Sequence, residues 1–140
     1  MRVFLTVLAA RDLMAKDANG LSDPFCFLSL CDSEGKFLPE TTRYKTPTQY
    51  KTLLPDWTSN SPFVFDPIVN GEVCGIRIEV WDEDRLSSDE FLGFMIALPD
   101  EFYQEGKEIS KWVALCPRPS REEKVTGDIC ICIRVTMNCD

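Results

Sequence analysis

The sequence contains no histidine, no serine-nucleophile motif and no cysteine pair with metal-binding spacing, and each absence excludes a class of chemistry. Histidine is the commonest zinc ligand and the commonest general base at neutral pH. A G-x-S-x-G sequence, which would place a nucleophilic serine on a sharp turn, does not occur. The seven cysteines include no C-x-x-C pair, and their odd number indicates reduced thiols rather than a disulfide framework. We therefore do not expect an enzyme.

Long apolar segments and an excess of basic charge are missing as well. No run of about 20 apolar residues occurs, so we expect no membrane-spanning helix. The N-terminus lacks the basic start and continuous apolar region of a signal peptide, which favours a cytoplasmic protein. With 15 Lys and Arg against 23 Asp and Glu, the net charge is −8. A nucleic-acid partner is not expected, because its binding surface would have to be basic.

Alternation of apolar and polar residues is what the sequence does contain, and it indicates β-strands. The 140 residues fit a single domain, 1–140, with a full core. About eight short strands are expected, at 2–8, 25–31, 41–45 with 50–52 (pieces of one strand that Pro47 interrupts), 63–65, 76–81, 91–98, 112–115 and 129–136. A loop is expected at 66–71 and one or two helical turns at 99–108. Because no long amphipathic helix occurs, the fold class is all-β, an antiparallel sandwich.

Carboxylates are concentrated in two loops of this pattern. Asp82 and Asp84 open a dense acidic stretch between two expected strands, and because one residue separates them they project to the same side of an extended loop. Far upstream, Asp17 and Asp23 bracket a tight turn that can bring their carboxylates toward each other. Carboxylates packed this tightly repel one another unless a bound hard cation offsets the repulsion. We therefore expect the two loops to meet in space around a cation.

Calcium fits these ligands better than magnesium does. Ca²⁺ accepts about 6–8 oxygen ligands from carboxylates, backbone carbonyls and water, whereas Mg²⁺ keeps its water and rarely takes an all-protein site. Neither loop is an EF-hand, because the twelfth position is Leu28 counted from Asp17 and Gly93 counted from Asp82. The alternative is that the carboxylates are solvated turn residues, since Asp and Asn favour turns. The candidate side-chain ligands are Asp17, Asp23, Asp82, Asp84 and one of Asp89 or Glu90.

Four segments carry a family resemblance. They read D-A-N-G-L-S-D-P-F at 17–25, K-T-L-L-P-D-W at 51–57, W-D-E-D-R-L-S-S-D-E-F-L-G at 81–93 and G-D-I at 127–129. In this order they resemble segments of C2 domains, the membrane-targeting sandwich modules found in protein kinase C and synaptotagmin. Leu54 stands where that family usually has Asn. The resemblance implies an eight-stranded sandwich in the circularly permuted topology of phospholipases and novel protein kinases C.

The same resemblance implies roles for individual residues. The calcium ligands that it implies are the backbone carbonyls of Lys16 and Glu83 and the side chains of Asp17, Asp23, Asp82 and Asp84, with Asp89 or Glu90 as the last carboxylate. The family usually has Asp at the position of Glu90, and this departure predicts a looser site or fewer bound ions. Leu21 and Leu86, at the loop tips, are expected to dip into the lipid interface, with Arg85 on phosphate. The alternative is that the leucines pack on the base of their own loops.

The function implied by the resemblance is calcium-dependent binding to anionic, phosphatidylserine-like phospholipid membranes. Such a cytoplasmic signalling module would be recruited to the inner membrane surface when calcium rises, because bound Ca²⁺ reverses the negative potential of the loops. Two alternatives remain open at this point. The chain could be a calcium-independent C2-like module that binds a protein partner, or the regulatory fragment of a larger enzyme.

Overall fold

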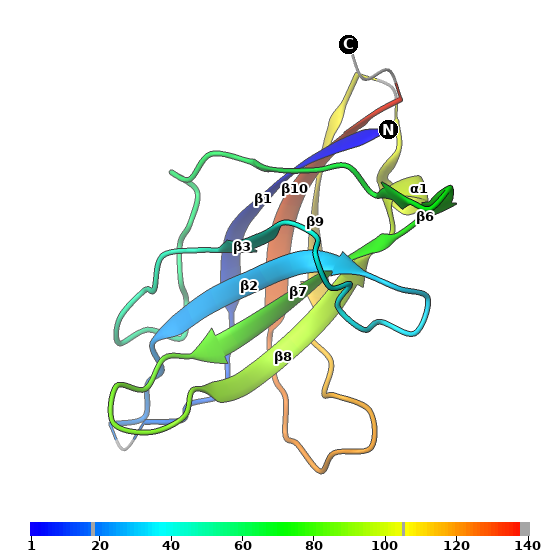
Figure 1. Ribbon diagram of the computed structural model, residues 1–140. Coiled ribbons are helices and arrows are strands. Elements are labelled where there is room, and N and C mark those ends of the chain that lie inside the picture. The colour runs from blue at the N-terminus through cyan, green and yellow to red at the C-terminus, as the bar shows by residue number, and fades with distance from the viewer. Residues whose placement is uncertain (18, 105, 138–140) are drawn as a thin grey trace.

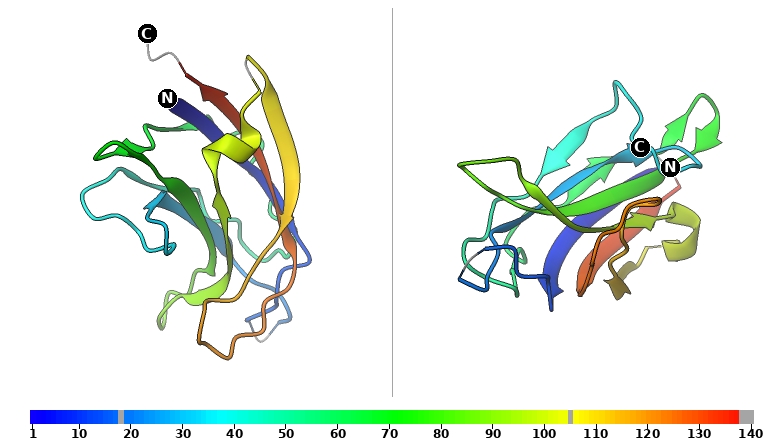
Figure 2. Two further views of the ribbon diagram at one scale, coloured as in Figure 1. Left: turned by 90° about the vertical axis from the view of Figure 1, so that its right-hand side faces the viewer. Right: turned by 90° about the horizontal axis from the view of Figure 1, so that it is seen from below.

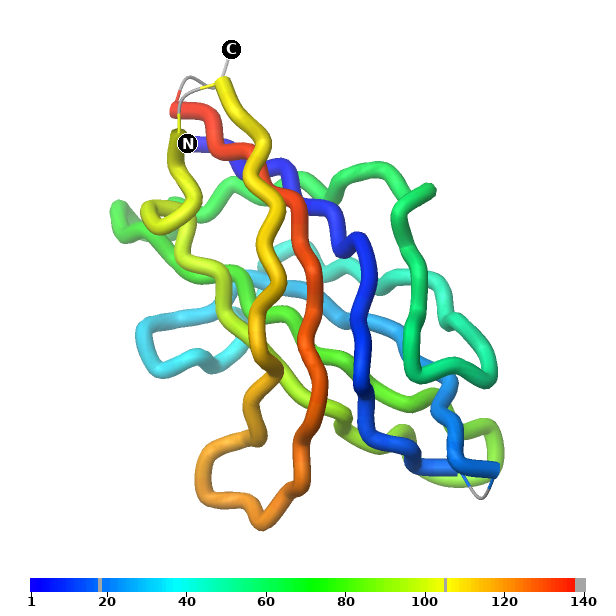
Figure 3. The backbone as a smooth tube through the Cα atoms, turned by 180° about the vertical axis from the view of Figure 1, so that it is seen from behind, coloured from blue at the N-terminus to red at the C-terminus, as the bar shows by residue number. Residues whose placement is uncertain are grey.

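Two antiparallel β-sheets face each other in the computed structural model, which describes residues 1–17, 19–104 and 106–137. Figure 2 shows the two layers from the side. The elements are β1 (Arg2–Arg11), β2 (Pro24–Cys31), β3 (Arg43–Lys45), β4 (Phe63–Phe65), β5 (Ile68–Val69), β6 (Glu72–Val73), β7 (Gly75–Asp82), β8 (Glu90–Ala97), α1 (Pro99–Phe102), β9 (Glu108–Ala114) and β10 (Asp128–Thr136). One sheet has the order β4-β1-β10-β9 and lies in front in Figure 3, and the other has the order β3-β2-β7-β8. A small hairpin, β5-β6, stands apart from both sheets.

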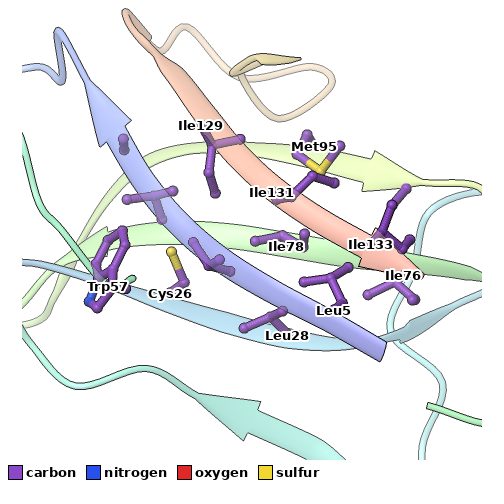
Figure 4. Packing of buried hydrophobic residues seen from close by; sticks show 14 of the residues in the cluster. Leu5, Cys26, Leu28, Trp57, Ile76, Ile78, Met95, Ile129, Ile131 and Ile133 are labelled. Carbon is purple, nitrogen blue, oxygen red and sulfur yellow. The ribbon is translucent and has the colours of Figure 1, made fainter. Parts of the chain in front are cut away.

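The core lies between the two sheets and follows from the alternation in the sequence. Every second residue of β1 and β10 points inward, so Leu5 and Ile133, which pair across the two strands, are both fully buried. Ile78 of β7 faces them from the other sheet (Figure 4). Trp57 closes one end of the core, and its indole N–H donates to the carbonyl of Pro47 at 2.8 Å. Burial of these side chains supplies the main favourable free energy of folding.

Strand pairing places the two acidic loops side by side. Strands β2 and β7 run antiparallel with Pro24 opposite Asp82, so β2 begins where β7 ends. Loop 1, which joins β1 to β2, and loop 3, which joins β7 to β8, therefore leave the sandwich at the same end (Figure 1). Loop 2, which joins β3 to β4, contacts loop 1 there, because the amide of Thr52 donates to the carbonyl of Ser22 at 2.8 Å.

The antiparallel sandwich expected from the sequence is confirmed, with three local differences. The expected loop at 66–71 contains part of the β5-β6 hairpin, in which Ile68 pairs with Val73. The expected strand piece at 50–52 is wrong, because Lys51 has a φ of +54°, outside the β region. The helical turns expected at 99–108 shorten to α1, and β9 already begins at Glu108. The permuted connectivity stays a prediction.

Two further expectations concern cysteines and membrane spans. Six cysteines lie among the described residues and all are free thiols, while Cys139 lies outside the described residues. Burial raises the pKa of Cys31 to about 11, so this thiol stays protonated at neutral pH. In the described ranges, the structure contains no helix with the length and apolar character to cross a membrane.

Candidate metal centre

Three carboxylates from two loops come together at one end of the sandwich. Within the described part of the chain, ligand oxygens of Asp17, Asp23 and Asp82 all lie within 4.8 Å of one another. Asp17 and Asp23 belong to loop 1, and Asp82 is the last residue of β7. The expectation that the two acidic loops meet in space is therefore met by these three residues.

Backbone hydrogen bonds within loop 1 hold its two carboxylates in place. The carbonyl of Leu21 accepts bonds from the amides of Lys16 and Asp17, at 3.2 and 2.9 Å. The buried hydroxyl of Ser22 donates to the carbonyl of Met14 and accepts a bond from the amide of Lys16. Gly20 closes the turn with a φ of +79°, a conformation that residues with a side chain rarely adopt. The turn predicted between Asp17 and Asp23 thus folds back on itself.

Asp82 is the buried member of the group. It is 1% exposed, and its Oδ1 atom accepts a hydrogen bond from the amide of Asp23 at 2.7 Å. The pKa of Asp82 is raised to about 6, with burial as the largest cause; the neighbouring charges of Asp17 and Asp23 also raise it, and the hydrogen bond from the amide of Asp23 lowers it. A buried carboxylate between two others is the environment that a hard cation stabilises. The donor set therefore fits Ca²⁺.

Loop 2 supports the site through the backbone of Lys51. The amide of Lys51 donates to Oδ1 of Asp23 at 2.6 Å, and this is the residue with the left-handed backbone conformation. Such strained conformations persist where surrounding bonds fix them and are frequent at functional sites. On the other side, the amide of Glu83 donates to the carbonyl of Asp23 at 2.9 Å. Asp23 is thereby held by both neighbouring loops.

Asp84 lies beside the group of three rather than in it. Its carboxylate accepts bonds within loop 3, from the amides of Leu86 and Ser87 at 2.9 and 3.3 Å and from the hydroxyl of Ser87 at 2.7 Å. These bonds stabilise the ionised form and lower the pKa of Asp84, with the hydroxyl of Ser87 as the largest cause. Asp84 still lines the same cavity as Asp17 and Asp23.

The structure brings neither candidate for the last carboxylate to this group. Asp89 accepts a hydrogen bond from the amide of Asp84 at 2.9 Å, so its carboxylate closes loop 3. Glu90 begins β8 opposite Asp82 and is exposed. Neither residue is among the described residues that line the cavity between loops 1, 2 and 3.

The cavity beside the carboxylates has a volume of about 720 Å³ and contains residues that the sequence reasoning missed. The hydroxyl of Tyr50 lies 3.1 Å from Oε2 of Glu83, and the guanidinium of Arg85 donates to the same hydroxyl at 3.3 Å. Thr48 donates to the other oxygen of Glu83 at 3.2 Å. The sequence offered a weak signal for Tyr50, because it directly precedes the K-T-L segment at 51–53.

The two expected membrane contacts differ in exposure. Leu86 is 97% exposed, so the alternative that it packs on the base of its loop is wrong. Leu21 is partly buried, and its amide donates to the side chain of Asn19 at 3.0 Å. Leu86 is the most exposed of the large apolar side chains at this end of the molecule, ahead of Leu54 at 67% and Tyr50 at 54%.

A family model for the C2 domain matches residues 1–115. The chain belongs to the C2 domain family. Similar curated proteins include the Rho GTPase-activating protein gacEE of Dictyostelium discoideum, 37% identical over 129 residues, which are 92% of this chain and 20% of that protein. Another is human multiple C2 and transmembrane domain-containing protein 1, 36% identical over 102 residues, which are 73% of this chain and 9% of that protein.

Solved C2 structures confirm the fold. A C2 domain of plant extended synaptotagmin 1 superposes with a TM-score of 0.73 at 23% identity, covering 95% of this chain and 92% of that one. Human GIVD cytosolic phospholipase A2 superposes with a TM-score of 0.72 at 20% identity, covering 99% of this chain and 17% of that one. The C2 domain spans a fifth or less of the curated relatives named above. Membership of the C2 domain family suggests membrane or lipid binding.

Proposed function

We propose that this C2 domain binds Ca²⁺ between loops 1 and 3 and then attaches to anionic phospholipid membranes. The observation that carries the proposal is the group of Asp17, Asp23 and Asp82, whose oxygens lie within 4.8 Å of one another with Asp82 buried. Three carboxylates this close repel one another in the absence of a cation. An oxygen-ligand site built on loops suits calcium rather than magnesium.

Further ligands are available next to the three carboxylates. We assign the backbone carbonyls of Lys16 and Glu83, which neighbour Asp17 and Asp82 in the chain, to the same ion or ions. Asp84 is a further side-chain ligand in this proposal, and it would have to release its bonds to Ser87 in order to bind. Asp89 and Glu90 do not bind the ion in this proposal: Asp89 closes loop 3 and Glu90 begins β8.

Charge reversal explains why calcium and anionic lipid would bind together. The loop end of the domain is acidic without an ion and repels a negatively charged membrane. Bound Ca²⁺ supplies positive charge and coordination positions for phosphate oxygens. Binding of each partner then raises the affinity for the other, as linkage requires. Leu86 inserts into the lipid interface and Arg85 contacts phosphate in this arrangement.

The proposed role in the cell is that of a non-catalytic recruitment module. A cytoplasmic chain of net charge −8 has little affinity for the acidic inner membrane surface until its loops are neutralised. A rise in calcium would then move the domain to that surface. Salt should weaken the attachment, because part of it is electrostatic.

Sedimentation with phosphatidylserine vesicles tests the proposal. Wild-type protein should sediment with the vesicles in calcium and stay in the supernatant with a chelator. The double variant Asp17→Asn, Asp82→Asn should lose this sedimentation, whereas Asp12→Asn, an exposed carboxylate outside the group, should behave as wild type. Sedimentation of the double variant at the wild-type calcium concentration would contradict the proposal.

One observation favours a second function, a calcium-independent module that binds a protein partner. The carboxylates of Asp84 and Asp89 are both engaged by hydrogen bonds within loop 3, so the acidic loops could serve structure alone. The melting temperature with and without millimolar calcium separates the two functions, because an ion that binds only the native state raises it. An unchanged melting temperature would favour the protein-binding module.

A further inference from the structure

A second large cavity lies far from loops 1 and 3. Its volume is about 840 Å³, and it opens between the turn after β2, the β5-β6 hairpin and the segment that joins β8 to α1. Figure 1 shows the hairpin and α1 on the opposite side of the molecule from loops 1 and 3, and the view from below in Figure 2 agrees. The lining residues used below are Asp32, Val73, Gly75, Ile96, Leu98, Glu72 and Glu101.

The walls of this cavity expose apolar side chains. Val73 is 48% exposed and Leu98 is 46% exposed, and both line the cavity. Ile68 is 49% exposed and pairs with Val73 across the hairpin. A patch of large apolar side chains around a hollow marks an interaction site more often than scattered single exposed residues do.

The floor of the cavity is already formed. A Cβ atom at Gly75 would lie 2.9 Å from Ile96 and 3.3 Å from Leu98, so a side chain at Gly75 has no space and the backbone packs directly on these neighbours. A preformed hollow avoids the ordering cost that a flexible surface would add to binding.

The charged side chains that line the cavity are all acidic. They are Asp32, Glu72 and Glu101, and no Lys or Arg is among the described lining residues. Asp32 uses its carboxylate to accept bonds from the amides of Glu34 and Lys36 at 2.8 and 3.0 Å. None of the ion pairs among the described residues includes Glu72 or Glu101. Two carboxylates beside an apolar hollow therefore lack cationic partners.

We propose that this cavity binds a basic, amphipathic segment of a partner protein. Apolar side chains of the segment would pack on Val73 and Leu98, while its Lys or Arg residues would pair with Glu72 and Glu101. Because the cavity is remote from loops 1 and 3, the domain can hold this partner while its loops are attached to a membrane. The inference uses none of the residues assigned to calcium or lipid, so it stands whether or not that assignment holds.

Titration with two synthetic peptides tests the inference. Both peptides carry leucines at the same positions, with lysine at the remaining positions of one and glutamate at those of the other. Fluorescence anisotropy at physiological salt, with a chelator and without vesicles, should show binding of the lysine peptide only. The variant Glu72→Gln, Glu101→Gln should weaken that binding by about five- to tenfold, as expected for the loss of two partly exposed ion pairs.

Charge-matched controls separate the cavity from general electrostatics. Asp12→Asn, Glu122→Gln removes the same charge elsewhere and should keep wild-type affinity for the lysine peptide. Asp17→Asn, Asp23→Asn should also keep it. If either control variant weakens binding of the lysine peptide as much as Glu72→Gln, Glu101→Gln does, the peptide is attracted by general acidity and the inference is wrong.

The apolar wall has its own control. Val73→Thr keeps the branched shape of the side chain in β6 and should weaken binding of the lysine peptide. Val64→Thr, on the exposed face of β4, should leave this binding unchanged. Equal binding of the glutamate peptide would overturn the proposed charge recognition. If the wild-type chain self-associates and Val73→Thr abolishes this self-association, the cavity binds a second copy of the chain instead.

Discussion

Asp82 accepts a hydrogen bond from the amide of Asp23, with 2.7 Å between the oxygen and the nitrogen. The two residues are 59 positions apart, and the pairing of Pro24 with Asp82 brings them together. The two halves of the proposed calcium site are thus joined before any ion binds. A site arranged in advance loses less conformational entropy on binding, which favours affinity.

Asp82→Asn should abolish the calcium-induced rise in melting temperature while leaving the fold intact. The amide oxygen of Asn can still accept the bond from Asp23, but the side chain no longer carries the negative charge that calcium requires. Without calcium the variant should be at least as stable as wild type, because a buried charge near Asp17 and Asp23 has been removed. Calorimetry with and without calcium measures both effects. A calcium response of wild-type size in the variant would contradict the assignment of Asp82.

The raised pKa of Asp82 predicts a pH dependence with a definite sign. Burial sets this pKa at about 6 in the folded protein against an ordinary value of 3.8, so the folded state holds the proton more tightly than the unfolded state. The unfolding free energy of calcium-free wild type should therefore fall, relative to Asp82→Asn, as the pH rises from 3.8 to about 6. Denaturant titrations at several pH values measure this difference. If the difference in unfolding free energy between wild type and Asp82→Asn does not change over this pH range, Asp82 is not desolvated.

The same proton competes with calcium. At a pH below about 6, Asp82 is increasingly protonated and the apparent calcium affinity should decline with each further step toward acid. Calcium titrations between neutral and mildly acidic pH check this, with Asp12→Asn, an exposed carboxylate outside the group, as the control. An affinity independent of pH in this range would exclude Asp82 from the ligand set.

Sequence reasoning located the three grouped carboxylates because their positions depend on regular patterns. The alternation that ends at Asp82 and the turn residues between Asp17 and Asp23 are local signals, and strand pairing adds the rest. The last carboxylate could not be chosen in this way. Neither Asp89 nor Glu90 joins the group, because Asp89 accepts a hydrogen bond from the amide of Asp84 and Glu90 begins β8, and this arrangement exists only in the folded loop.

Two other features depend on context that the sequence does not display. The hairpin pairs only Ile68–Val69 with Glu72–Val73, and strands this short carry too little alternation to be recognised. The local sequence predicts a strand at Tyr50. Instead, the left-handed backbone of Lys51 turns the chain, and the hydroxyl of Tyr50 contacts Glu83. At Tyr50 a tertiary hydrogen bond outweighs the local strand propensity.

Leu86→Ser should lower the affinity for phosphatidylserine vesicles in calcium by about tenfold. Burying a leucine side chain fully in an apolar phase contributes about 1.5–3 kcal/mol, and partial insertion into the interface contributes less. Calcium affinity without vesicles and the melting temperature should not change, because Leu86 is 97% exposed and packs on nothing that folding requires. Val64→Ser, an exposed apolar residue on β4, is the matched control. Unchanged vesicle affinity in Leu86→Ser would exclude insertion of this side chain.

Ser87→Ala tests whether Asp84 is a calcium ligand. The hydroxyl of Ser87 donates to Asp84 at 2.7 Å and holds its carboxylate within loop 3. If Asp84 must leave this bond to reach the ion, removing the hydroxyl should raise calcium affinity by about three- to tenfold, since a typical hydrogen bond contributes about 1 kcal/mol net. Isothermal titration calorimetry measures the change, with Ser88→Ala as the neighbouring control. An affinity equal to that of wild type would mean that Asp84 keeps its place in loop 3, so that Asp17, Asp23 and Asp82 bind calcium without it.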